Sequence, residues 1–278
     1  MSDSDGAVPG PPRKRWPLGL AGGLGLLLLV SLFAAVISLR TIEGSIPGRE
    51  PVLGLAAAGE YFLVGTAAGV YVSTDGVQWS ALEQFSQGAL VAQAGSDVLV
   101  LSQGELYRGA GPASLELVAD GLPGALALAG DAAGRAWLGR EEDLLIVEPE
   151  GERRPVRHRE GPDDMVALAV DDTNTDKVFA GSLSSGLWYS RNGGRRFEPV
   201  LETPTRAVVV SVSGPRRFIG TAGGVLYSTP TDPWEFTDLR LSIEALARAD
   251  RQYYAITTDR LLYRSADGLA WEPVAATD

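Results

Sequence analysis

Tyr189-Ser190-Arg191-Asn192-Gly193-Gly194-Arg195-Arg196-Phe197 is the stretch of this sequence that decides the fold. Its Asn-Gly pair supplies residues that tolerate positive φ, which a hairpin turn between twisted strands requires. The side chains of Ser190 and Asn192 are of the kind that hydrogen-bond backbone N–H groups within a turn. The stretch therefore predicts a strand, a tight turn and a second strand, which begins with the apolar residue Phe197.

Copies of this hairpin recur along the chain. They read Ser-Thr-Asp-Gly-Val-Gln-Trp at 73–79, Ser-Ala-Asp-Gly-Leu-Ala-Trp at 265–271 and, in worn form, Ser-Thr-Pro-Thr-Asp-Pro-Trp at 228–234. Weaker copies of the incoming strand occur at 105–108 and 143–146. Spacings of 36, 39, 43, 38 and 36 residues separate the anchors Tyr71, Tyr107, Ile146, Tyr189, Tyr227 and Tyr263. A period of this size, filled with short strands, is typical of propeller blades or solenoid coils.

Each repeat has the same internal order. An apolar strand and a polar turn precede a second strand that ends in Gly-Thr or Gly-Ser, and a third strand, the hairpin turn and a fourth strand follow. Four antiparallel strands in about 40 residues is the size of a propeller blade. The sequence therefore predicts an all-β fold, a six-bladed β-propeller of four-stranded antiparallel blades. The expected blades span residues 52–85, 89–118, 125–157, 165–201, 206–239 and 243–275.

The Ser-x-Asp-Gly-x-x-Trp elements resemble the Asp-boxes, or BNR repeats, of sialidase-like propellers, sortilin-type receptors and the photosystem II assembly-factor family. The residues that carry this resemblance are Ser73, Asp75, Trp79, Ser190, Asn192, Phe197, Ser265, Asp267 and Trp271. The sequence departs from the pattern where Asn192 replaces the aspartate, and its second and third repeats have no box. The resemblance implies the fold family rather than one activity.

The N-terminal region has the pattern of a membrane anchor. Residues 1–17 are rich in Ser, Asp, Gly and Pro and predict a disordered N-terminus, and no charged residue occurs from Trp16 to Leu39. An apolar span of this length predicts one transmembrane helix, at residues 18–39, with a cleaved signal peptide as the alternative. The cluster Arg13-Lys14-Arg15 before it places the N-terminus in the cytoplasm and the rest of the chain outside.

The expected organisation is therefore a single-pass protein of the cell membrane with an extracytoplasmic propeller. Residues 40–51 contain Gly44, Pro47, Gly48 and Pro51 and predict a linker, and residues 52–278 form the propeller. A linker of this length reaches at most about 35 Å when extended. The propeller is therefore expected to stay near the membrane surface, which limits its partners to molecules on or in that membrane.

The composition excludes some classes of function. The chain carries 24 basic and 35 acidic residues, and outside residues 1–40 the balance is 20 against 33. Such an acidic domain argues against a general nucleic-acid binder, which needs a basic face. There is no cysteine, which excludes a disulfide framework and a thiolate metal site. Only two of the basic residues are lysine, alongside many Ala and Gly, which hints at a GC-rich bacterial source.

Two acidic features suggest a site, and each has a simpler interpretation. Asp75, Asn192 and Asp267 of the boxes have the chemistry of catalytic carboxylates or their amides, but Asx side chains ordinarily cap their own turns. Residues 171–176 (Asp-Asp-Thr-Asn-Thr-Asp) have the alternating spacing of a calcium loop. However, Lys177 stands where that loop needs Gly, and no Glu occupies the twelfth position. We therefore expect no metal and no cofactor.

One basic run interrupts the acidic domain, with Arg153, Arg154, Arg157 and Arg159 near the expected fourth strand of the third blade. Such a cluster can bind lipid phosphates or an acidic protein. The alternative is an edge strand that its charges protect from pairing. His158, which lies within the run, is the chain's only histidine and has no second histidine for base or metal chemistry.

Three functions remain open at the level of the sequence. The first is a non-enzymatic, membrane-anchored scaffold, an assembly factor or accessory subunit of a membrane protein complex that docks on the complex or on an anionic membrane surface. The second is a sialidase-type glycosidase, and the third is a module that binds cell-surface glycan. A sialidase needs a cluster of arginines and a Tyr/Glu nucleophile pair. The residues of those types considered for these roles are Arg140, Arg216, Arg217, Arg260, Tyr253 and Tyr254. Nothing in the sequence marks any of them, so we expect the scaffold and no catalytic residue.

Overall fold

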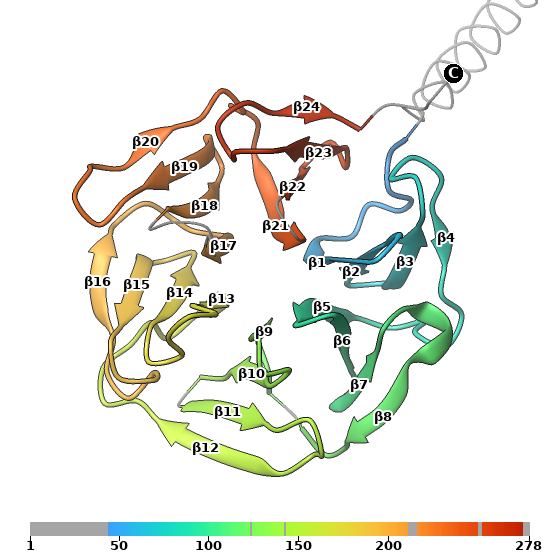
Figure 1. Cartoon of the computed structure of the whole chain (residues 1–278), viewed down its shortest axis with the longest axis horizontal. Helices are drawn as coiled ribbons and strands as arrows, with labels where there is room; N and C mark the ends of the chain where they lie inside the picture. The colour runs from blue at the N-terminus through green and yellow to red at the C-terminus, as the bar shows by residue number, and fades with distance from the viewer. Residues whose placement is uncertain (1–43, 123, 142, 211–215, 250–251, 275–278) are drawn as a thin grey trace, which may run out of the picture. The chain divides into compact units, whose positions relative to one another are not determined.

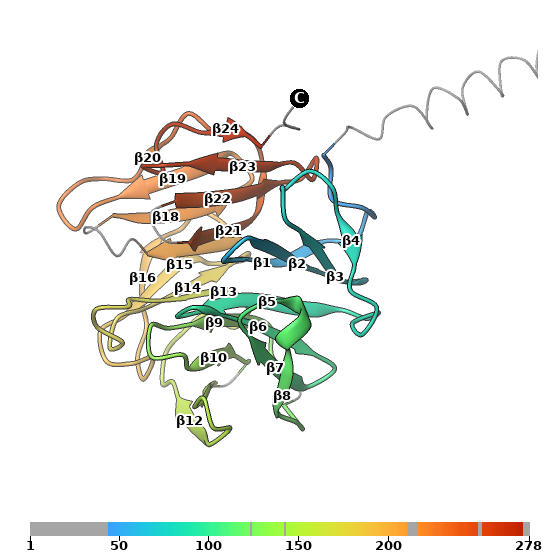
Figure 2. The ribbon, with the colours of Figure 1, turned by 45° about the vertical axis from the view of Figure 1, so that its right-hand side comes forward.

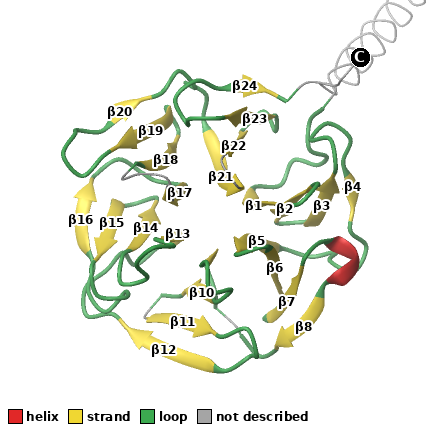
Figure 3. Ribbon diagram, viewed as in Figure 1, coloured by secondary structure: helices red, strands yellow, loops and turns green. Residues whose placement is uncertain are grey.

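The computed structural model describes residues 44–122, 124–141, 143–210, 216–249 and 252–274. In this part of the chain, six four-stranded antiparallel sheets surround a common axis (Figure 1). Each sheet is one blade, and its strands follow in sequence order from the centre of the ring to its rim. Strands and turns make up nearly all of the described chain, beside the short 3-10 helix η1 (Pro112–Ser114; Figure 3). The six-bladed propeller predicted from the sequence is confirmed.

The strands of the six blades have the following bounds. Blades 1 and 2 comprise β1 (Val52–Ala58), β2 (Tyr61–Thr66), β3 (Gly69–Ser73) and β4 (Ser80–Ala81), then β5 (Ala89–Ala94), β6 (Asp97–Ser102), β7 (Glu105–Gly109) and β8 (Glu116–Ala119). Blades 3 and 4 comprise β9 (Ala127–Gly130), β10 (Ala136–Gly139), β11 (Asp143–Val147) and β12 (Arg153–Arg157), then β13 (Met165–Val170), β14 (Val178–Ser182), β15 (Gly186–Ser190) and β16 (Glu198–Leu201). Blades 5 and 6 comprise β17 (Ala207–Val210), β18 (Arg217–Thr221), β19 (Gly224–Ser228) and β20 (Glu235–Phe236), then β21 (Ile243–Ala249), β22 (Gln252–Thr257), β23 (Leu262–Ser265) and β24 (Glu272–Pro273).

The repeat pattern locates the blades closely. The first strand of every blade begins within two residues of the position expected from the sequence. The weak copies at 105–108 and 143–146 are the third strands β7 and β11, as the repeat predicts. The period is therefore preserved in blades 2 and 3 although neither has a box turn.

The hydrophobic core lies between neighbouring blades rather than in one central mass. Phe197, which follows the turn of blade 4, is 1% exposed and packs against Leu144 and Ile146 of blade 3. Full burial of such an aromatic side chain contributes roughly 1.5–3 kcal/mol. Gly268 shows how close this packing is, because a Cβ atom added there would lie 2.4 Å from the ring of Phe218 in blade 5. Its φ of +77° independently favours glycine. The hairpin turns therefore contribute to the packing between neighbouring blades.

The ring closes where blade 6 meets blade 1, and among the described residues the two sheets share no strand. The segment before β1 packs into this seam, since Ile46 is 1% exposed and its N–H donates to the carbonyl of Arg260 at 3.0 Å. The Arg260 guanidinium donates to the carbonyls of Ile46 at 2.9 Å, Pro47 at 2.8 Å and Glu50. Residues 46–50, which belong to the linker expected over 40–51, are thus held on the propeller.

The predicted transmembrane helix at residues 18–39 lies outside the residues that the structure describes. Within the described ranges, no helix has the length and apolar character needed to cross a bilayer. The membrane anchor therefore remains a prediction from the sequence.

Candidate functional site

The predicted box turns are closed by their own side chains. Asp75 Oδ1 accepts hydrogen bonds from the N–H groups of Val77 at 2.8 Å and Gln78 at 2.7 Å. Ser73 Oγ accepts one from the N–H of Gly76 at 2.8 Å. Closely related contacts recur around Ser265, Asp267 and Gly268, and around Ser190, Asn192 and Gly194. The geometry is that of capped turns, in which each carboxylate or amide oxygen is directed at its own backbone.

The aromatic residues of the boxes lie between blades. Trp79 packs in the cluster that joins blades 6 and 1, and Trp271 packs in the cluster that joins blades 5 and 6. Trp271 also donates from Nε1 to the carbonyl of Gly268 at 3.0 Å, which ties the aromatic back to its own turn. Together with Phe197, these side chains serve packing between sheets rather than a sugar-binding surface.

Replacing Asp267 with alanine is expected to lower the free energy of unfolding by about 0.5–2 kcal/mol, as for a lost side-chain cap. The alanine leaves the N–H groups of Leu269 and Ala270, which Asp267 Oδ1 now accepts at 2.8 and 3.1 Å, without this acceptor. Chemical denaturation of both proteins measures the difference. Asp232→Ala is the control, because Asp232 in the worn turn accepts from the hydroxyl of Thr229 and should cost less. Equal losses would show that the cap is not what stabilises the box.

The box carboxylates also predict a dependence on pH. The N–H of Gln78 and then that of Val77 lower the pKa of Asp75, and the N–H of Leu269 is the main cause of the lowered pKa of Asp267. Since an unfolded Asp has a pKa of about 3.9, this stabilisation is complete above about pH 5 and is lost as pH falls through the lower, folded pKa. The double variant Asp75→Asn, Asp267→Asn should melt below the wild type at pH 7, and the gap should shrink under acid. A gap in melting temperature that stays constant down to pH 3 would contradict this linkage.

The acidic loop after β13 does not gather its oxygens at one point. Asp171 Oδ1 accepts from the N–H of Thr173 at 2.9 Å, and Asn174 Oδ1 accepts from the N–H of Asp176 at 3.1 Å. Asp172 turns away from both and pairs with Arg248. In the described part of the chain, no group of three or more acidic or histidine side chains is arranged to hold a metal ion.

The arginines considered for a sialidase site do not converge. Arg140 forms a two-pronged ion pair with Asp143, and Arg217 lies over the ring of Phe179 at 5.2 Å. Arg216 donates to the carbonyl of Asp267, and Arg260 is buried in the seam described above. Tyr253 and Tyr254 follow one another on β22 and pack in two different inter-blade clusters. Each of these side chains therefore has a structural role apart from the others.

The basic run forms an exposed surface on the rim of the ring. It lies on and just after β12, the outermost strand of blade 3 (Figure 2). The structure adds residues that the sequence reasoning missed, since the N–H of Arg159 donates to the carbonyl of Arg195 at 3.1 Å and brings the turn of blade 4 alongside. We call this surface the basic edge, and its side chains, all exposed, are Arg153, Arg154, Arg157, Arg159, Arg195 and Arg196. The sequence carried a signal for Arg195 and Arg196, because the box that contains Asn192 is one residue longer than the boxes at Asp75 and Asp267.

Few acidic groups neutralise the basic edge. Arg153 donates to the carbonyl of Asp120 at 2.6 Å and lies 3.3 Å from its carboxylate, and Arg196 pairs with Glu160 at 3.1 Å. Exposed pairs of this kind contribute about 0–1 kcal/mol, so a partner can replace them at little cost. Within the described residues, the other four arginines of the edge make no ion pair.

His158 lies beneath the basic edge rather than on it. Its ring packs edge-on against Phe197, with centroids 6.1 Å apart. Burial lowers the pKa of His158, and the nearby carboxylates of Asp143 and Asp163 oppose this only in part. Because the neutral form is favoured, His158 adds no charge to the edge at neutral pH.

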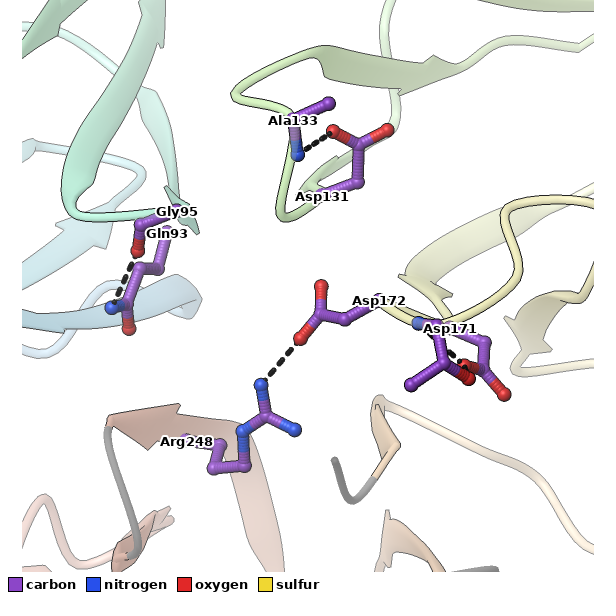
Figure 4. A network of polar contacts seen from close by, with 8 residues as sticks. Gln93, Gly95, Asp131, Ala133, Asp171, Asp172 and Arg248 are labelled. Carbon is purple, nitrogen blue, oxygen red and sulfur yellow. Dashed lines mark hydrogen bonds and ion pairs between the residues drawn. The ribbon is translucent and has the colours of Figure 1, made fainter. Parts of the chain in front are cut away.

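The inner strands surround a central channel of about 340 Å³, which the sequence reasoning did not identify. At one mouth, Arg248 of β21 and Asp172 after β13 point toward one another and pair at 2.5 Å (Figure 4). This ion pair joins blade 6 to blade 4. Asp131 also lies at this mouth, but its carboxylate caps its own turn, accepting from the N–H groups of Ala133 and Arg135 at 3.0 Å each. The available signal was a pair of charged residues, Glu244 and Arg248, in a strand whose other residues are apolar.

These features define a minimal six-bladed propeller with a basic edge, and comparison with known proteins agrees at the level of fold. No protein-family model matches the chain, and no curated protein sequence matches it. Among solved structures, YCF48 from Cyanidioschyzon merolae is 15% identical with a TM-score of 0.50, over 82% of this chain and 86% of that one. A structure of YCF48 bound to D1 peptide is 16% identical with a TM-score of 0.51, over 82% of each chain.

An enzyme also shares the fold. The GH74 enzyme of Niastella koreensis is 18% identical with a TM-score of 0.54, over 82% of this chain. This chain spans only 38% of that enzyme. At such identities the likeness is one of fold, and the β-propeller assignment is what it supports.

Proposed function

We propose that this protein is a non-enzymatic, membrane-anchored extracytoplasmic propeller that docks onto a membrane protein complex as an assembly factor or accessory subunit. The observation that carries the proposal is the basic edge, because six exposed arginines gather on one rim of an otherwise acidic propeller. A net negative domain is repelled by anionic surfaces, so a local basic surface is the natural face for acidic groups. The anchor itself rests on the sequence of residues 18–39.

Two further observations support docking over catalysis. The arginines that a sialidase site would need are each engaged elsewhere, as are the box carboxylates. A propeller of similar fold, YCF48, is described with a bound D1 peptide, which supports a similar use of this scaffold in binding a peptide segment of another protein. The connections between strands are short throughout the described residues, which leaves little chain from which to build a substrate pocket.

Affinity purification of the tagged full-length protein from solubilised native membranes tests this function. We expect a defined set of membrane proteins to co-purify at low salt and to be lost as salt rises, because exposed charge pairs are screened. The same preparation should neither hydrolyse a fluorogenic sialoside nor bind a glycan array. Hydrolysis would favour the glycosidase, retention on glycans would favour the glycan-binding module, and recovery of the protein alone would overturn the proposal.

A further inference from the structure

An apolar groove lies on the face of the propeller where the second and third strands of blades 1–3 are joined. Its volume is about 350 Å³. Its lining includes Leu53, Leu90, Leu101, Gln103, Leu122 and Leu126. Leu53 and Leu126 are 40% and 44% exposed, so their side chains are open to solvent at the groove. A recess between exposed leucines is a surface that association would bury.

The groove is uncharged in a protein that is rich in charge. Charged residues make up 21% of the sequence, yet among the described residues that line the groove there is none. Burying a charged group there would cost its hydration without offering a counter-charge. The lining therefore complements an uncharged apolar segment and disfavours an acidic or basic one. The groove thus favours uncharged, apolar groups, whereas the basic edge favours acidic groups.

The groove also offers backbone hydrogen-bonding groups. It includes the beginning of β5, and Leu53 of β1 lines both the groove and the central channel. Each of these inner strands pairs with one other strand only, β1 with β2 and β5 with β6. The other edge of each strand faces the channel and has no strand partner among the described residues, although the N–H of Val52 at the start of β1 donates to the carboxylate of Glu244 at 3.4 Å. An extended peptide can pair with such an edge, whereas a lipid acyl chain cannot.

We propose that this groove binds an extended, uncharged peptide segment of the partner protein. The leucines receive its apolar side chains, and the inner-strand edges at the channel mouth pair with its backbone. The inference rests on the proposed function only in that the peptide belongs to a protein on which the propeller docks. Binding of an acidic surface at the rim and of an apolar segment on the face would then be two separate contacts.

The test uses the full-length protein in lipid nanodiscs and a displayed library of random 12-residue peptides. We expect the enriched peptides to be uncharged and apolar. Leu53→Glu and Leu126→Glu should each raise the dissociation constant of a synthetic enriched peptide at least tenfold. Leu183→Glu is the matched control, since Leu183 is 43% exposed but lies on blade 4, away from the groove, and should change binding less than twofold. Thermal unfolding checks that all three variants are folded.

Several outcomes would overturn the inference. They are enrichment of charged peptides, no enrichment, or equal loss of binding in the Leu183 variant. Peptide binding that strengthens when residues 1–43 are removed would assign the groove to this chain's own N-terminal segment instead. A dimer in sedimentation that the peptide dissociates would assign it to a second copy. Co-purification with a membrane complex is measured separately, so its persistence without peptide binding would remove this inference and leave the proposed function.

Discussion

Replacing Arg260 with alanine is expected to lower the free energy of unfolding by about 3 kcal/mol, the largest loss of stability that we expect from a single substitution in a turn. The guanidinium, in a residue only 9% exposed, donates to three carbonyls of residues 46–50. A hydrogen bond to a charged group contributes about 1.5–3 kcal/mol, and such contributions within one network are not additive. For a domain of this size, the loss corresponds to a fall of roughly 6–12 °C in melting temperature.

Two further variants separate the possible causes. Arg260→Lys keeps the charge, but a single ammonium cannot reach three carbonyls as the planar guanidinium does, so its stability should be intermediate. Arg264→Ala removes another arginine of blade 6, one that pairs with Glu272 at 2.8 Å with both side chains more than half exposed. It should change stability by less than about 1 kcal/mol. If Arg260→Ala has the same melting temperature as the wild type, the segment before β1 does not hold the seam closed.

The features that the sequence predicted are those that depend on short-range pattern. The hairpin at 189–197 and its copies fix the positions of turns and third strands, because positive φ and Asx capping are local requirements. Once those are placed, the period alone sets the number of blades. The third strands β7 and β11 were found without a box because residues 105–108 and 143–146 keep the pattern of the incoming strand at the spacing of the repeat.

The features that the sequence did not predict depend on contacts between residues far apart in the chain. Arg260 lies 214 residues from Ile46. The Gly and Pro residues between Ile46 and β1 are as typical of a linker as of a packed segment. Asp172 and Arg248 meet across the channel only because the ring closes. Arg159 and Arg195 become neighbours because blade 4 packs on blade 3. None of these pairs has a periodic signal.

The location of the basic edge bears on what it binds. Residues 46–50 enter the propeller at the seam of blades 6 and 1, whereas the basic edge lies at the seam of blades 3 and 4, on the opposite side of the ring (Figure 1). The proposed anchor precedes this entry point. The basic edge is thus remote from the point where residues 46–50 join the propeller.

Reversing four arginines of the basic edge to glutamate is therefore expected to weaken association with the native complex by several hundredfold or more at low salt. Each basic residue near an acidic surface contributes about 1 kcal/mol, and the effect decays over a Debye length of about 8–10 Å. Co-purification at several salt concentrations measures the loss, with binding to anionic vesicles as a parallel measurement. Because the four side chains are exposed, thermal unfolding should change little. The substituted residues are Arg153, Arg154, Arg157 and Arg159.

The control variant carries the same change in net charge at other exposed positions, so it separates the effect of the edge from that of the overall charge. Its four substitutions to glutamate are at Arg49, Arg206, Arg240 and Arg264. We expect it to bind the complex severalfold more weakly at most, because charges distant from the contact act only through screened, long-range repulsion. Equal loss in both variants would make net charge the cause. Unchanged co-purification of a folded basic-edge variant would leave these arginines with the role of protecting an outer strand from pairing, and loss of vesicle binding alone would make lipid, rather than a protein, the partner of the edge.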